Sequence, residues 1–184
     1  MEFDAGKPNM KKAIIAITIF SVTAAMICLG IYNDTNHGAL LTAAITFGTT
    51  AYHFLMRLSV GFLFDNVMNN RADYTKSWYQ CRTWETKLYE RLHVKCWKRG
   101  IPTYDSSLFD CKKHSWHEIV QASCQAELVH EVIALLSFLP ILFSVWFDAT
   151  AVFLITSVLA ASVDITFVII QRYNRPRMMR LIGR

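Results

Sequence analysis

Residues 124–140, with the sequence CQAELVHEVIALLSFLP, place ionisable side chains at the start of an apolar run long enough to enter a membrane. Glu127, His130 and Glu131 stand at positions i, i+3 and i+4, so a helix would put them on one face. A histidine beside a carboxylate is the usual arrangement of a general base, because the carboxylate orients the ring and stabilises the imidazolium. The spacing therefore predicts that His130, held by Glu127 or Glu131, accepts a proton from a bound substrate.

Two other apolar runs also carry ionisable residues. Residues 40–64 place His53 and Arg57 on one helical stripe with Thr46 and Thr50, and residues 150–171 contain Asp164. Ionisable groups inside a membrane usually face the interior of the helix bundle and pair with one another. We expect a single catalytic site in the cytoplasmic half of the membrane, formed by His53, Arg57, Glu127, His130, Glu131 and Asp164.

Other roles for these residues stay open. Arg57 could neutralise Asp164 or Glu131 in a structural ion pair, and His53 could serve as a hydrogen-bond partner between helices. Two histidines and three carboxylates could also ligate a metal ion, but the motif HEXXH is absent, and we expect neither a metal nor a cofactor. A second set has the right ligand types but drifts around a helix: Cys111, His114, His117 and Cys124.

The elements that must position these residues are transmembrane helices. The chain has 184 residues, 53% of them hydrophobic, and the apolar residues are clustered. A helix needs about 20 residues to cross about 30 Å of hydrocarbon. Four runs meet that length, at about 13–32, 40–64, 129–147 and 150–171. The pattern predicts an all-α membrane protein with one integral membrane domain over residues 1–184.

The basic residues predict the orientation of the spans. Three Lys precede the first run, ten Lys or Arg lie between positions 65 and 128, and five follow position 171. The connections NDTNHG and FDAT contain none. The positive-inside rule then places both termini and the loop 65–128 in the cytoplasm of a multi-pass protein. No nucleic-acid-binding module is present, so we expect membrane lipids as partners and no nucleic acid.

The loop 65–128 is too long to be a structureless connection. We expect a first cytoplasmic helical piece over about 70–98, ended by Gly100 and Pro102 and rich in aromatic and basic residues that suit the lipid interface. A second helix is expected to begin near Ser115 and to continue into the third span. The predicted fold is thus four transmembrane helices with a cytoplasmic helical or interfacial insertion between the second and third.

Three stretches resemble a known family. They are YERLHVKCWKRGIP, with a Lys-x-Trp-Lys core at Lys95, Trp97 and Lys98; QAELVHE, with an Ala-Glu-Leu-x-His element ending at His130; and QRYNRPR, residues 171–177. In this order they resemble the bacterial glycosyl-4,4'-diaponeurosporenoate acyltransferases, which complete the carotenoid staphyloxanthin. The resemblance covers about residues 75–180.

This resemblance implies transfer of a fatty acyl group to a sugar hydroxyl of a membrane glycolipid in the bacterial cell membrane. His130 would act as the base, and Arg57 or Arg172 would stabilise the oxyanion. A cytosolic acyl donor such as acyl-CoA and a glycosylated, carotenoid-like acceptor would be the partners. The expected binding residues for the donor or substrate are Lys95, Trp97, Lys98, Arg172, Asn174, Arg175 and Arg177. A non-catalytic membrane scaffold and a metal-dependent lipid hydrolase are the alternatives.

Overall fold

The computed structural model describes residues 10–101 and 106–182, and these are entirely helices, turns and irregular connections. Four helical segments are long and apolar enough to cross a membrane. They belong to α1 (Met10–Thr35), to α2 (Gly38–Met68), to α5 (Trp116–Leu136) with its continuation to Phe147, and to α7 (Thr150–Ile182). The predicted all-α fold with four spans is confirmed.

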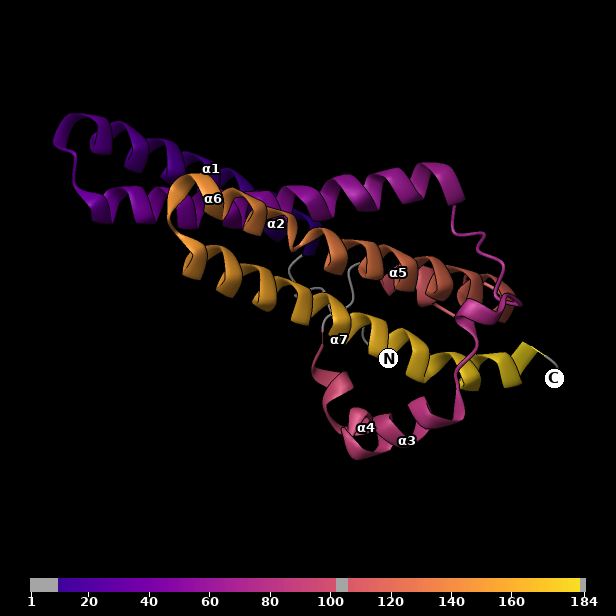
Figure 1. The fold of residues 1–184 in the computed structure, drawn as a ribbon. Coiled ribbons are helices and arrows are strands. Elements are labelled where there is room, and N and C mark those ends of the chain that lie inside the picture. The colour runs from indigo at the N-terminus through magenta and orange to yellow at the C-terminus, as the bar shows by residue number, and fades with distance from the viewer. Residues whose placement is uncertain (1–9, 102–105, 183–184) are drawn as a thin grey trace.

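The bundle consists of two helical hairpins (Figure 1). Helix α1 packs along α2, while α5 packs along α7, and α2 contacts both α5 and α7. Met56 and Val60 of α2 form an apolar core with Ile133 of α5. One turn before Met56 on α2, the Tyr52 hydroxyl donates a hydrogen bond of 2.9 Å to the Leu136 carbonyl of α5. Helix α2 therefore aligns its polar stripe with the two helices that carry the other ionisable residues.

The third span begins earlier than its apolar run suggests. Ser115 caps α5: its Oγ accepts the Glu118 backbone N–H at 3.3 Å, and the Glu118 carboxylate accepts the Ser115 N–H at 2.8 Å. The expected start near Ser115 and the continuation into the third apolar span are thus confirmed. Beyond Leu136 the span changes to a 3-10 turn with Pro140 in its first turn, η4 (Leu139–Phe143), followed by the short α6 (Ser144–Phe147).

The insertion between α2 and α5 differs from the expectation of one helix over about 70–98. It contains the turn η1 (Ser77–Tyr79), α3 (Thr83–Arg91), α4 (Val94–Trp97), η2 (Lys98–Gly100) and, before α5, η3 (Ser106–Phe109). His93 has a left-handed φ of 52°, which ends α3 and starts the next turn. Pro102, which we expected to end the first helix, lies outside the described residues.

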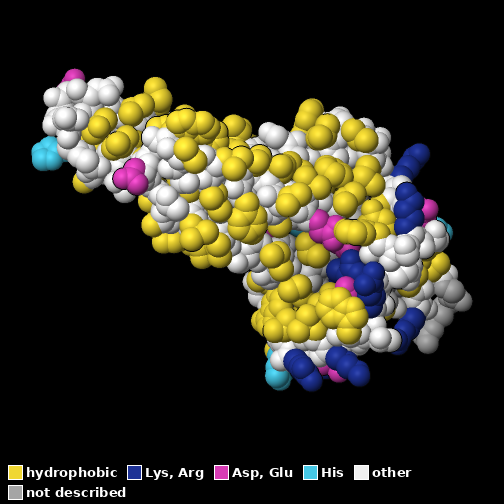
Figure 2. Space-filling model, viewed as in Figure 1, with side chains coloured by type: hydrophobic (Ala, Val, Ile, Leu, Met, Phe, Trp, Pro, Cys, Tyr) yellow, Lys and Arg dark blue, Asp and Glu magenta, His cyan; other side chains and the backbone are white. Residues whose placement is uncertain are grey.

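The insertion projects sideways from one end of the bundle (Figure 1). Lys and Arg side chains gather at this end and on the insertion, whereas hydrophobic side chains cover the remaining length of the visible face (Figure 2). On α3, Trp84 and Leu88 are exposed, and they are followed by exposed Leu92 on the same helical face. The molecule therefore has a long apolar body and one charged end that carries an amphipathic arm.

Candidate active site

His130 is oriented by Asp164, a carboxylate on another helix. Its Nδ1 lies 2.9 Å from Asp164 Oδ1, and its ring stacks on Phe167 with the centroids 4.6 Å apart. Asp164 is 1% exposed and also forms an ion pair with Arg57 of α2. When Nδ1–H donates to the carboxylate, the lone pair of the neutral imidazole is on Nε2. We call His130, Asp164 and Arg57 the Asp164 cluster; it has the composition of an oriented general base.

Arg57 holds the second helix in this cluster. Besides Asp164, its guanidinium donates to the Ala160 carbonyl at 3.0 Å and to the His53 carbonyl at 3.2 Å. Arg57, one member of the predicted polar stripe on α2, therefore faces α7. The structural pairing considered for Arg57 is present, with Asp164 as its partner.

His53 is the most buried histidine of the described residues, at 4% exposure, and neither of its ring nitrogens has a hydrogen-bond partner there. The Ser157 hydroxyl on α7 is also fully buried, and it has no hydrogen-bond partner among the described residues. Two helical turns separate Ser157 from Asp164, and one turn separates His53 from Arg57. The interior of the bundle is therefore polar on the side of the Asp164 cluster that lies toward the FDAT turn.

Glu127 belongs to a second group of charges. Its carboxylate is 0% exposed, accepts Arg172 Nη1 at 2.6 Å and forms an ion pair with Arg175. Arg172 also pairs with Glu85 of α3, at 2.9 Å. We call Glu85, Glu127, Arg172 and Arg175 the Glu127 cluster. It has two positive and two negative side chains, and it joins the insertion to α5 and α7.

Arg172 and Arg175 also hold the turn Ser77–Tyr79. Arg172 donates to the Trp78 carbonyl at 3.1 Å, and Arg175 donates to the Tyr79 carbonyl at 2.9 Å while lying 5.4 Å above the Tyr79 ring. Glu131 accepts the indole N–H of Trp78 at 2.9 Å. The insertion therefore packs against α5 and α7 through Trp78 and Tyr79.

The basic residues expected at the donor site are divided by the fold. Lys98 Nζ donates to Asn174 Oδ1 at 2.5 Å and lies 4.7 Å from the centre of the Tyr173 ring; Arg177 lies 4.5 Å from the same centre and donates to its hydroxyl at 2.7 Å. These four residues form the Tyr173 cluster. Arg175, by contrast, is 1% exposed and does not present its guanidinium to a cytosolic ligand.

The two other expected donor-site residues lie on α4. Lys95 is exposed, and the Trp97 indole donates to the Leu92 carbonyl at 2.9 Å. Tyr89 of α3 contacts Tyr173 edge-on, and burial raises the pKa of Tyr89 to about 12, so its phenol stays neutral at pH 7. Lys95 and Trp97 therefore lie on the arm, close in sequence to Lys98 of the Tyr173 cluster.

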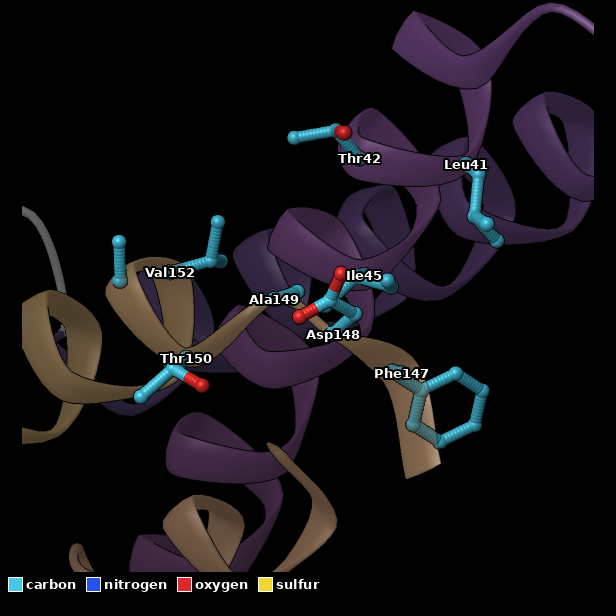
Figure 3. A pocket seen from close by; sticks show the side chains of 9 residues that line it. Leu41, Thr42, Ile45, Phe147, Asp148, Ala149, Thr150 and Val152 are labelled. Carbon is cyan, nitrogen blue, oxygen red and sulfur yellow. The ribbon is translucent and has the colours of Figure 1, made fainter. Parts of the chain in front are cut away.

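Hollows are present at two places among the described residues. One, of about 260 Å³, lies between α2 and the start of α7 (Figure 3) and is lined by Leu41, Thr42, Ile45 and residues 147–152. It is about 18 Å along α7 from Asp164, and hence remote from His130. The other, of about 470 Å³, lies near the junction of α2 and α5, with Arg71, His114 and Gln121 in its lining.

The structure pairs the expected site residues differently from the expectation. The expected single site is divided into the Asp164 cluster and the Glu127 cluster, and the carboxylate on His130 is Asp164 where we expected Glu127 or Glu131. Sequence reasoning missed Glu85, Trp78 and Tyr79, because nothing in the local sequence indicates that these segments fold back onto α7. Among the described residues, no group of three or more His, Cys, Asp or Glu could hold a metal ion.

The fold and these contacts define a multi-pass membrane protein with a histidine–carboxylate pair inside its bundle. The family model for glycosyl-4,4'-diaponeurosporenoate acyltransferase, CrtO, matches residues 75–184, which is more than half of the chain. The chain belongs to this family, so the family resemblance is confirmed and a glycolipid acyltransferase role is supported. No curated protein and no solved structure matches the chain.

Proposed function

We propose that the protein transfers a fatty acyl group from a cytosolic thioester, with acyl-CoA as the donor, to a sugar hydroxyl of a glycosylated, carotenoid-like lipid. The observation that carries the proposal is the contact of 2.9 Å between His130 Nδ1 and Asp164, which leaves Nε2 as a base within a family of acyltransferases. This arrangement matches a reaction in which a hydroxyl must lose its proton as it attacks a carbonyl.

In the proposed reaction, His130 Nε2 takes the proton of the sugar hydroxyl while the hydroxyl oxygen forms a bond to the thioester carbonyl carbon. The carbon–sulfur bond of the tetrahedral intermediate then breaks, and the imidazolium returns the proton to the thiolate. Asp164 orients the ring and stabilises the imidazolium. Arg57 shares Asp164 with His130 and supplies positive charge near the developing oxyanion.

The Tyr173 cluster is our proposed site for the phosphates of the donor. Lys98 and Arg177 converge on one ring there, and Arg has a geometry that suits phosphate oxygens. The exposed Lys95 adds a further charge on α4. In this proposal Arg175 has no contact with the donor, and together with Arg172 it keeps the insertion on the bundle.

We also propose that the charged end faces the cytoplasm of a bacterial cell membrane, with both termini on that side. The gathering of Lys and Arg at one end supports this orientation (Figure 2). The donor would then reach the Tyr173 cluster from the cytosol, while the acceptor stays within the bilayer.

The test is lipid mass spectrometry on cells that make the glycolipid acceptor and express the wild type, His130→Ala or His37→Ala. His37 is an exposed histidine in the connection before α2 and serves as the matched control. Equal amounts of each form in the membrane must be shown first. We expect one added acyl mass on the glycolipid with the wild type and His37→Ala, and none with His130→Ala. If none of the three cultures gains the acylated glycolipid, the result would contradict the enzyme and favour the non-catalytic scaffold.

The donor proposal has its own test with purified protein. We expect the double variant Lys98→Met/Arg177→Met to raise KM for acyl-CoA about tenfold or more, because two charge-assisted contacts are lost. The KM for an acyl thioester without phosphates should stay unchanged. An equal rise for both donors would show that the variant disturbs the fold and would contradict phosphate binding at this cluster.

A further inference from the structure

The Trp78 side chain is held at its edge and open at its face. Its indole N–H donates to Glu131 at 2.9 Å, and its backbone carbonyl accepts Arg172 at 3.1 Å. Nevertheless the residue is 62% exposed. The hydrogen bond to Glu131 therefore fixes the exposed ring, and Arg172 of the Glu127 cluster fixes the backbone that carries it.

A fixed and exposed indole suits a sugar. The π face of an aromatic ring carries negative charge and attracts the polarised C–H bonds on the apolar face of a pyranose. A ring whose edge is already hydrogen-bonded loses little side-chain entropy when a ligand stacks on it. Glu131 adds the second requirement, because a carboxylate can accept hydrogen bonds from sugar hydroxyls beside the one it accepts from the indole.

We propose that Trp78 and Glu131 form the subsite for the acceptor sugar, with Trp78 as the stacking platform and Glu131 as the hydroxyl acceptor. Glu131 directly follows His130 in α5, so the proposed subsite lies at the same height along the helix as the proposed base. This inference rests on the proposed acyl transfer and names the part of the site that would hold its sugar substrate.

Trp84 provides the comparison. It is 56% exposed on α3 and shares its exposed face with Leu88, which is typical of a side chain at the lipid interface. Trp78 differs because its indole is tied to a site carboxylate. An exposed tryptophan with this additional contact is better explained by a polar ligand with an apolar face than by lipid tails.

The kinetic test uses the purified full-length protein in lipid nanodiscs with acyl-CoA and a glycosylated lipid. We expect Trp78→Ala to raise the KM for the glycolipid about tenfold, the effect of losing one favourable aromatic contact, without changing the KM for acyl-CoA. Trp78→Phe keeps the π face and should stay within about threefold of the wild type. Trp84→Ala, the matched control, should leave both KM values unchanged.

Two kinetic results would overturn the proposal. If Trp78→Ala raises the KM for the glycolipid no more than Trp84→Ala does, the ring does not contact the sugar. If Trp78→Phe is as defective as Trp78→Ala, the indole N–H that positions Glu131 is what matters, and the stacking role is wrong.

A binding test remains decisive if the protein proves not to transfer acyl groups. A variant with Trp78 as the sole tryptophan, the other four being replaced by Phe, is titrated with a short-chain alkyl glucoside and, in parallel, with the corresponding alcohol. We expect the glucoside alone to shift the Trp78 emission and to protect it from acrylamide. No change, or an equal change with both compounds, would refute the sugar subsite independently of the reaction.

Discussion

Replacing Glu127 by Gln should strongly destabilise the protein. The Glu127 carboxylate is fully buried between Arg172, at 2.6 Å, and Arg175, and the whole Glu127 cluster is electrically neutral. The substitution removes one negative charge and leaves one buried positive charge in excess. Breaking a buried ion pair in this way costs about 3–5 kcal/mol, of which the amide oxygen recovers about 1 kcal/mol as a hydrogen-bond acceptor. We therefore expect the free energy of unfolding to fall by about 2–4 kcal/mol.

The measurement is equilibrium unfolding by SDS in mixed micelles, followed by circular dichroism. Glu131→Gln is the matched control: the same change on the same helix, at a half-buried side chain that accepts the Trp78 indole. It should cost less than about 1 kcal/mol, because the amide oxygen still accepts that hydrogen bond. A loss below about 1 kcal/mol for Glu127→Gln as well would show that backbone carbonyls alone neutralise the two arginines, and would refute the reasoning.

Three further predictions concern other parts of the molecule. Asp164→Asn should lower the rate of acyl transfer by about 10²-fold or more, since it removes the carboxylate that orients His130; an unchanged turnover of purified protein would contradict that role. Trp84, kept as the only tryptophan in vesicles, should be quenched more by lipids brominated near the headgroup than by lipids brominated at the chain end, and the absence of quenching would exclude interfacial docking of α3. Burial raises the pKa of the Cys81 thiol, so a smaller fraction of it is thiolate at pH 7. Maleimide should therefore label Cys81 more slowly than the exposed Cys96, and the labelling rate of Cys81 should rise as the pH rises toward its pKa. Equal labelling rates for the two thiols at pH 7 would contradict the shift.

The number and approximate position of the spans could be predicted because apolar length is a property of local sequence. The start of α5 at Trp116 was equally accessible, since Ser115 and Glu118 form a capping box that local sequence encodes. The insertion was predicted less well. Its aromatic and basic composition suggested one long helix, but the left-handed backbone at His93 breaks it, and tertiary contacts to α7 decide where the segments lie.

That the charged residues of the apolar helices pair with one another could be predicted, because such charges face the interior of a bundle. Which residue pairs with which could not be predicted. Helical spacing places Glu127 and Glu131 near His130 on one helix, but the rotation of α5 turns His130 toward Asp164 and Glu127 toward Arg172. Which carboxylate meets the histidine depends on the register between α5 and α7, and a single helix carries no information on that register.

The ion pair between Arg57 and Asp164 has a consequence for biogenesis, because 107 positions of the chain separate its partners. Chains are synthesised at about 5–20 residues per second, so Arg57 is made about 5–20 s before Asp164. During that interval the guanidinium has no Asp164 carboxylate beside it, and its long side chain can extend toward the lipid headgroups. Only the insertion of α7, which carries Asp164, draws it inward. The charges of the Asp164 cluster are therefore complete only once α7 has inserted, and a chain that stops before α7 would leave Arg57 without its carboxylate partner.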